Sequence, residues 1–150
     1  MAKQRVFLMA VLLAACGVGS ACDEKLSSIA GPTPNLAPTF ATIQSEIFEK
    51  GDSTGRPACT NCHTANGRTP AGGLNLTHDV AYEMIVNVPS RAKAGATRVI
   101  PSDPDSSYLI QKLEGTPGIV GQRMPFNGGP FLSDGQILIM RRWIANGAPR

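Results

Sequence analysis

Apolar residues recur three and four positions apart in four segments of this 150-residue chain. Such spacing places apolar side chains on one face of an α-helix. The four segments are residues 40–50, 79–88, 104–114 and 134–146. Alternating patterns typical of strands are scarce. The pattern therefore predicts an all-α domain, with long loops at residues 64–77 and 116–130.

Local signals mark the ends of the first two helices. Thr39 stands immediately before the first segment, where a side-chain oxygen caps a helix, and Gly51 follows the segment as its stop. Pro89 prevents the second helix from continuing, because proline lacks the N–H that a helix interior requires.

The third and fourth helices have stronger start signals. Asp103 is predicted to cap the third helix, with Pro104 in its first position and Gly115 closing it. Ser133 and Gln136 have the spacing of a capping box, in which side chain and backbone at the helix start bond to each other. Residues 134–146 are therefore the most strongly predicted helix.

The N-terminus has the pattern of an export signal. Lys3 and Arg5 precede an apolar run at residues 6–15, which is too short to span a bilayer. The run leads into Leu-Ala-Ala-Cys at residues 13–16, which resembles the bacterial lipoprotein box. Residues 1–16 are therefore predicted to be a lipoprotein signal, with Cys16 lipidated. This places the protein on the periplasmic side of the cell envelope, held to a membrane by its lipid.

Two other readings of the N-terminus stay open. Ordinary cleavage after Ala21 would leave a soluble periplasmic protein. Cys22 is the other candidate for lipidation, or a spare thiol.

Composition divides the rest of the chain into a linker and one domain. Residues 17–38 are rich in Gly, Ser, Ala and Pro and are predicted to be a flexible tether. Residues 39–150 fit one small domain that has few large aromatic side chains. The formal net charge of +3 includes Lys3 and Arg5 of the export signal. The remaining charge is nearly balanced, which argues against nucleic acid as a partner.

The segment Cys59-Thr60-Asn61-Cys62-His63 carries the most specific chemical signal. Two cysteines in this spacing, followed directly by histidine, are typical of covalent haem attachment. Cys59 and Cys62 are predicted to form thioether bonds to one haem c, and His63 to bind its iron.

Zinc and dithiol chemistry are the alternatives for this cysteine pair. A structural zinc ion needs four ligands, and only Cys16, Cys22 and His78 are left to supply the others. A thioredoxin-like dithiol begins a helix after a strand, whereas a loop is predicted before Cys59.

The second axial ligand of the iron is predicted to be Met124. It lies in a Gly- and Pro-containing loop without helical periodicity, where an apolar side chain has little packing role. Met84 and Met140 occupy apolar faces of predicted helices, where packing explains them. His78 is the competing ligand, although a surface or capping role is its ordinary explanation.

The mature chain resembles the planctomycete-type cytochrome c domain over most of its length. The resemblance rests on the attachment segment and on Gly72-Gly73-Leu74, Val88-Pro89-Ser90, Arg98-Val99-Ile100-Pro101, Asp103-Pro104-Asp105, Arg123-Met124-Pro125 and Trp143-Ile144. It implies a class I cytochrome c-like helical bundle around one haem, with His63 and Met124 as the axial pair. Ser102 departs from the pattern, since glycine is expected before Asp103.

The predicted function is electron transfer between redox partner proteins, without enzymatic activity. Two alternatives are a haem-based sensor, in which Met124 leaves the iron, and a haem subunit of a larger envelope oxidoreductase. Peroxidase-like catalysis ranks last, because it needs an acid–base residue near the haem and only His78 is available. Arg56, Arg68 and Arg123 are candidates for steering partners, with solvated surface charge as the alternative.

Overall fold

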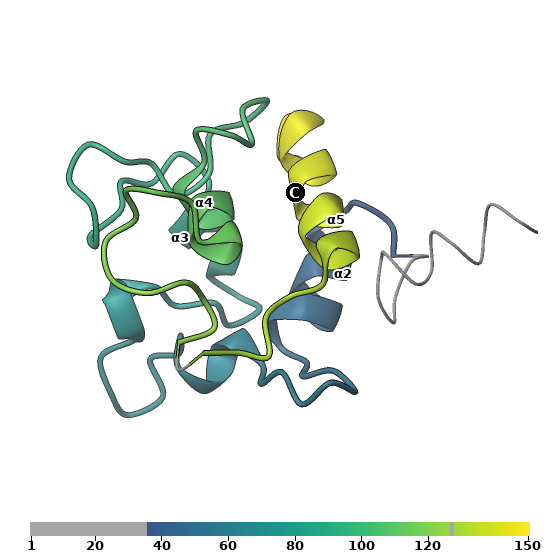
Figure 1. Cartoon of the computed structure of the whole chain (residues 1–150), viewed down its shortest axis with the longest axis vertical. Coiled ribbons are helices and arrows are strands. Elements are labelled where there is room, and N and C mark those ends of the chain that lie inside the picture. The colour runs from purple at the N-terminus through teal and green to yellow at the C-terminus, as the bar shows by residue number, and fades with distance from the viewer. Residues whose placement is uncertain (1–35, 127) are drawn as a thin grey trace, which may run out of the picture.

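The computed structural model describes residues 36–126 and 128–150 (Figure 1). Its helices are α2 (Phe40–Ile43), η1 (Gln44–Phe48), η2 (Cys59–Asn61), η3 (Ala71–Gly73), α3 (Ala81–Ile85), α4 (Tyr108–Glu114) and α5 (Asp134–Ala145). Within these residues, pairing of the β type is limited to isolated bridges. The predicted signal, Cys16, Cys22 and most of the predicted linker at residues 17–38 lie outside the described residues.

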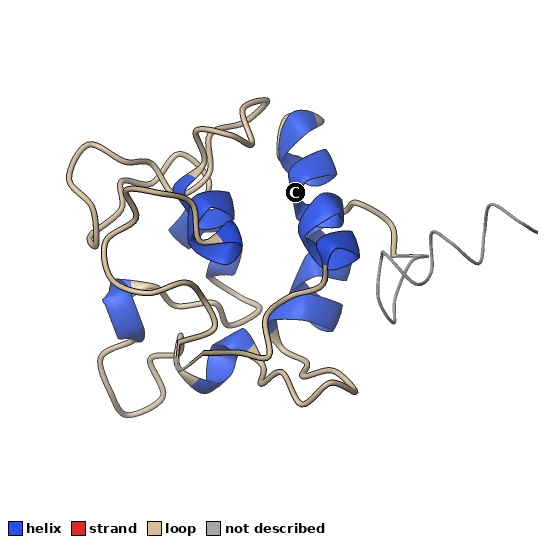
Figure 2. Cartoon of the chain, viewed as in Figure 1, coloured by secondary structure: helices blue, strands red, loops and turns tan. Residues whose placement is uncertain are grey.

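Helices make up 34% of the described chain, and loops and turns account for most of the rest (Figure 2). A cytochrome c-like bundle around a haem therefore stays a prediction. In the part of the chain that the structure covers, no helix has the length and apolar character needed to cross a membrane.

Helix α5 begins with the capping box that the sequence predicts. The Ser133 hydroxyl accepts a hydrogen bond from the backbone N–H of Gln136 at 3.2 Å, and the Ser133 N–H donates to Oε1 of Gln136 at 3.0 Å. Leu132 and Ile137, on either side of the cap, are both buried in the core. The start of the longest helix is thus confirmed.

The first predicted helix is divided into an α-helical and a π-helical part. Thr39 caps α2, because its hydroxyl accepts the N–H of Thr42 at 3.2 Å. The wider turn of η1 is closed by a bond from the Glu49 N–H to the carbonyl of Gln44, five residues earlier. The helix ends at Phe48, two residues before the predicted end.

Helix α3 is much shorter than the predicted helix at residues 79–88. The N–H of Val99 bonds to the carbonyl of Ile85 at 3.0 Å, and the N–H of Asn87 bonds to the carbonyl of Val99 at 2.9 Å. The segment around Val99 thereby replaces the next helical turn, so tertiary pairing ends the helix before Pro89.

The predicted start of the third helix is wrong. Asp103 accepts the N–H of Ser106 at 3.0 Å and so closes a separate turn, while α4 starts at Tyr108. Gly115 ends α4 in the left-handed region, with φ of 73°, as predicted. Ser102, where glycine is expected by resemblance, has φ of 67°, a conformation that favours glycine.

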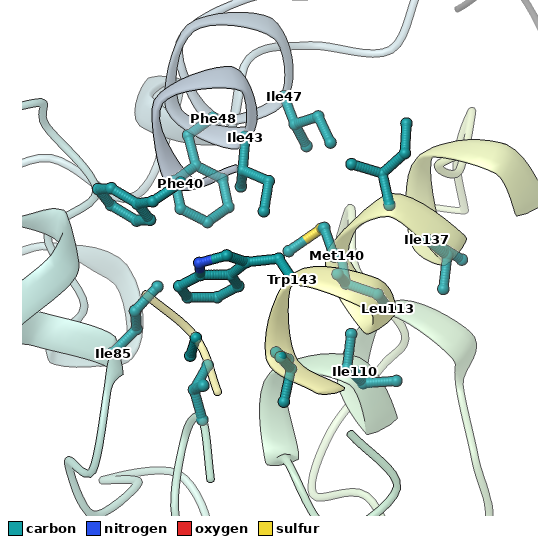
Figure 3. Packing of buried hydrophobic residues seen from close by; sticks show 14 of the residues in the cluster. Phe40, Ile43, Ile47, Phe48, Ile85, Ile110, Leu113, Ile137, Met140 and Trp143 are labelled. Carbon is teal, nitrogen blue, oxygen red and sulfur yellow. The ribbon is translucent and has the colours of Figure 1, made fainter. Parts of the chain in front are cut away.

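The core lies where α5 contacts α2 and α4. Figure 3 shows the indole of Trp143 beside Phe40, Ile43 and Ile85, which come from α2 and α3. Phe40 and Trp143 have ring centroids 5.6 Å apart, and Trp143 is fully buried. Met140 is also fully buried, as its predicted packing role requires.

Candidate haem site

The two cysteines lie on one tight turn of chain. Cys59 begins η2, and its carbonyl accepts the N–H groups of Cys62 at 3.2 Å and His63 at 2.9 Å. Both thiols are free, with Cys59 half-buried and Cys62 exposed. Burial raises the pKa of the Cys59 thiol, against the opposing effect of the Arg56 cation. The turn therefore brings both thiols and the imidazole together within one segment.

The ring of His63 is held by a backbone carbonyl. Its Nδ1 atom lies 2.9 Å from the carbonyl oxygen of Ala71. An imidazole that donates from Nδ1 presents Nε2, on the opposite side of the ring, to a metal. Burial lowers the pKa of His63, and the nearby Arg98 cation adds to this effect. The neutral form that binds a metal is thereby favoured.

Backbone bonds tie the following loop to the attachment segment. The N–H of Ala71 donates to the carbonyl of Cys62 at 3.1 Å, and the N–H of Leu76 donates to that of His63 at 2.8 Å. Gln44 of η1 donates to the carbonyl of Leu76 at 2.9 Å. Oε1 of Gln44 is the one buried side-chain polar atom without a partner in the described residues. Backbone hydrogen bonds thus hold the loop at residues 64–77 against the segment that carries His63.

Met124 lies on a loop anchored to α4. Its N–H donates to the carbonyl of Lys112 at 2.9 Å, and the peptide bond to Pro125 is cis. The hydroxyl of Tyr108 accepts the N–H of Val120 at 2.9 Å, and Arg123 donates to the carbonyl of Leu113 at 2.7 Å. Three contacts with one helix therefore fix the segment that leads to Met124.

The structure brings Met124 and Cys59 to the same apolar cluster. Both are partly buried and pack against the core that contains Trp143. Phe126 and Val120, near Met124 in the sequence, are 58% and 52% exposed. The loop that carries Met124 thus leaves apolar surface exposed to solvent.

Arg98 is a buried cation that sequence reasoning did not single out as a site residue. It is 6% exposed and donates to the carbonyls of Met84 at 2.6 Å and Gly73 at 3.2 Å. Within residues 36–126 and 128–150 it forms no salt bridge. Arg91 also lies against Gly73, since a Cβ built on this glycine would be 2.6 Å from Cδ of Arg91. The two cations share one region close to His63.

The positions of His78 and Arg56 bear on their predicted roles in opposite ways. His78 has 77% of its side chain exposed, with Nδ1 3.5 Å from the Asp79 carboxylate. This surface position matches its ordinary explanation. Arg56 is 1% exposed, so its assignment as a steering residue is wrong. Arg68 is exposed and donates to the carbonyl of Asn61, whereas Arg123 is half-buried.

An open groove of about 480 Å³ lies between α4, α5 and the loop that carries Arg123. It is lined by Glu114, Arg123, Asp134, Ile137, Leu138 and Arg141. The four candidate haem residues are not among its lining residues. In the described chain, no three side chains of His, Cys, Asp or Glu gather to hold a bare metal ion.

Comparisons of the chain with protein-family models, with curated proteins and with solved structures returned no match.

Proposed function

We propose that this protein is a monohaem c-type cytochrome that carries electrons in the bacterial cell envelope. Cys59 and Cys62 would hold one haem c covalently, with His63 and Met124 as the axial ligands. The observation that carries the proposal is the Cys-x-x-Cys-His segment, folded so that Nδ1 of His63 faces a backbone carbonyl.

Apolar and cationic residues of the described domain support the proposal. A haem has an apolar plane and two carboxylates, so its site needs apolar contacts and positive charge. Met124 and Cys59 pack against the apolar core, and Phe126 offers exposed apolar surface. Arg98, a buried cation without a salt bridge among the described residues, suits a haem carboxylate. Removing both carboxylates from water would otherwise be costly.

Each ligand residue has a defined task. When bound, the haem iron supplies a reversible one-electron change between its ferric and ferrous states. His63 would donate a neutral imidazole, oriented by Ala71, and Met124 a thioether that favours the ferrous state. The hydrogen bond from the Met124 N–H to the Lys112 carbonyl would help to keep Met124 at the haem in both oxidation states.

The proposal includes the cellular setting predicted from the N-terminus. Export is required, because this kind of haem attachment takes place outside the cytoplasm. A lipid on Cys16 would hold the protein to a membrane, where it would exchange electrons with redox partner proteins.

Covalent haem attachment is the first test of the proposal. The full chain, produced in a bacterium with the cytochrome c maturation machinery, is expected to be coloured and to keep its haem during acid acetone extraction. The reduced pyridine complex is expected to show two thioether bonds. Replacing Cys59 and Cys62 together by Ser should remove essentially all covalent haem, because no thiol in the attachment segment is left to react.

His78→Ala is the matched control, since this exposed imidazole lies outside the attachment segment. It is expected to keep a full complement of haem. Wild-type protein that stays colourless, or that releases its haem to acid acetone, would rule the proposal out.

Carbon monoxide separates the electron carrier from the haem sensor. The reduced carrier should bind it slowly at neutral pH, because Met124 occupies the iron. Fast binding would favour the sensor.

A further inference from the structure

Arg56 is a charged side chain enclosed by the attachment loop. It is 1% exposed, and its Nε lies 3.0 Å from Oδ2 of Asp52, whose side chain is 11% exposed. A buried ion pair is costly to desolvate and is held only by good geometry and additional hydrogen bonds. Its position three residues before Cys59 therefore points to a role at the attachment segment.

The guanidinium joins the end of the first helix to the attachment loop. Its two terminal nitrogens donate to the carbonyls of Ile47 at 3.3 Å, Lys50 at 2.8 Å and Pro57 at 2.9 Å. Ile47 belongs to η1, and Lys50 follows it. The planar fork of arginine suits such a set of acceptors, and lysine would serve fewer of them.

Cys59 uses one of the same acceptors. Its Sγ atom lies 3.4 Å from the carbonyl oxygen of Ile47, to which Arg56 also donates. The hydroxyl of Thr60 donates to the next carbonyl, that of Phe48, at 3.3 Å. The end of η1 thus positions the sulfur of Cys59 and the Arg56 cation beside each other.

The backbone of Arg56 packs closely against Gly51, which follows η1. A Cβ built on Gly51 would lie 2.6 Å from the carbonyl oxygen of Arg56. Such a contact is shorter than the backbone tolerates, so a glycine is required there for the close approach.

Asp52 connects this arrangement to α5. Besides Arg56, its carboxylate accepts hydrogen bonds from Thr54, and Oδ2 lies 3.5 Å from Nε2 of the buried Gln136. Gln136 is also part of the capping box of α5. The charge pair is therefore held by three separate segments.

We propose that Arg56 and Asp52 are positioning residues that hold Cys59 at the haem, and that their buried charges shift the midpoint potential of the iron in opposite directions. This inference rests on the proposed function. A cation near a haem favours the ferrous state, which carries one positive charge less, and a carboxylate opposes it. Salt screens buried charges far less than exposed ones.

Paired substitutions test the inference by the sign of their effects. Asp52→Asn should shift the midpoint potential upward, because it leaves the cation unopposed. Arg56→Gln should shift it downward, and the double variant should return it most of the way to the wild-type value. Potentials are measured by redox titration of purified holoprotein at low and high salt, and the shifts are expected to persist at high salt.

Arg56→Lys separates charge from positioning. It keeps the cation but has fewer donors, so the potential should stay near the wild-type value while the yield of doubly attached haem falls. Arg68→Gln is the control, since its exposed charge should produce a small shift that salt removes. If Arg56→Gln fails to incorporate covalent haem, the upward potential shift expected for Asp52→Asn is the deciding measurement.

Shifts in the same direction for the two single variants, no shift in Asp52→Asn, or shifts abolished by salt would each overturn the inference. These results presuppose wild-type protein with covalent haem. Wild-type protein without it would contradict the proposed function instead.

Discussion

Backbone groups of Ala71 and Leu74 orient the ring of His63. The Ala71 oxygen lies 2.9 Å from Nδ1, and the backbone bond from the Ala71 N–H to the Cys62 carbonyl keeps that residue in place. Ligand orientation of this kind is as important for a metal site as the ligand itself. Among the described residues, no hydrogen bond orients the thioether of Met124 in this way. The position of Met124 depends instead on the hydrogen bonds that anchor its loop to α4.

Under the proposed function, Met124→Ala would remove the second axial ligand and leave the haem attached. The charge-transfer absorption band from sulfur to ferric iron should disappear, and the midpoint potential should fall, because the thioether favours the ferrous state. Visible spectra and redox titration measure both effects.

Met84→Ala is the matched comparison, since Met84 belongs to α3 and the substitution leaves in place its backbone carbonyl, which accepts a hydrogen bond from Arg98. Its spectrum should match that of the wild type. An unchanged spectrum in Met124→Ala would show that the axial assignment is wrong.

At the scale of elements, the helix ends decide how much of each apolar segment becomes helical. Helix α5 keeps nearly its whole predicted length because its cap is local in sequence. Helix α3 loses its last turn to pairing with Val99, and α4 starts late because Asp103 closes its own turn. The local cap of α5 is therefore enough to fix its start, whereas the local signal at Asp103 closes a separate turn and the end of α3 yields to tertiary pairing.

Ser133→Ala should destabilise the folded protein by about 1 kcal/mol, the usual cost of a lost N-cap. The substitution leaves the N–H of Gln136 without the hydroxyl that accepts its hydrogen bond. Reversible urea unfolding of the holoprotein, followed by far-ultraviolet circular dichroism, measures the change.

Ser53→Ala serves as the control for this substitution, since Ser53 is exposed. It should change the free energy of unfolding by less than about 0.5 kcal/mol. Equal effects of the two substitutions would contradict the role of the cap.

At the scale of the whole molecule, the two ends of the described domain meet through Trp143. Figure 1 shows α2 and α5 side by side, and the indole N–H donates to the carbonyl of Pro149 at 2.7 Å. The hydroxyl of Tyr82, from α3, donates to the carbonyl of Ala148 at 2.9 Å. The C-terminal residues therefore close the core over α2 and α3.

Trp143→Ala should cost about 3–5 kcal/mol of folding stability, because it leaves a large cavity among Phe40, Ile43 and Ile85. Such a loss is a large share of the stability of a small domain, so much of the protein should be unfolded at 37 °C. Thermal unfolding followed by circular dichroism measures this.

Leu138→Ala, on the same helix but 44% exposed, should have a far smaller effect. A similar loss in both variants would show that α5 is not organised around Trp143.

The sequence by itself determined the features whose causes are local. The capping box at Ser133 and the end of α4 at Gly115 each depend on residues a few positions apart, and both are found where the sequence predicts them. The proposed haem attachment at Cys59, Cys62 and His63 rests on the same kind of local spacing. The candidate ligands and the helices with clear periodicity could therefore be predicted without a structure.

Only the tertiary structure decided the burial of Arg56 and Arg98, the shortening of α3 and the carbonyl that orients His63. An arginine in a sequence is ordinarily a surface charge. It becomes a buried one here because carbonyls from residues as far apart as 73 and 84 gather around Arg98, and helix-end carbonyls gather around Arg56. Contacts between distant segments have no signature in local spacing, since they exist only after the chain has folded.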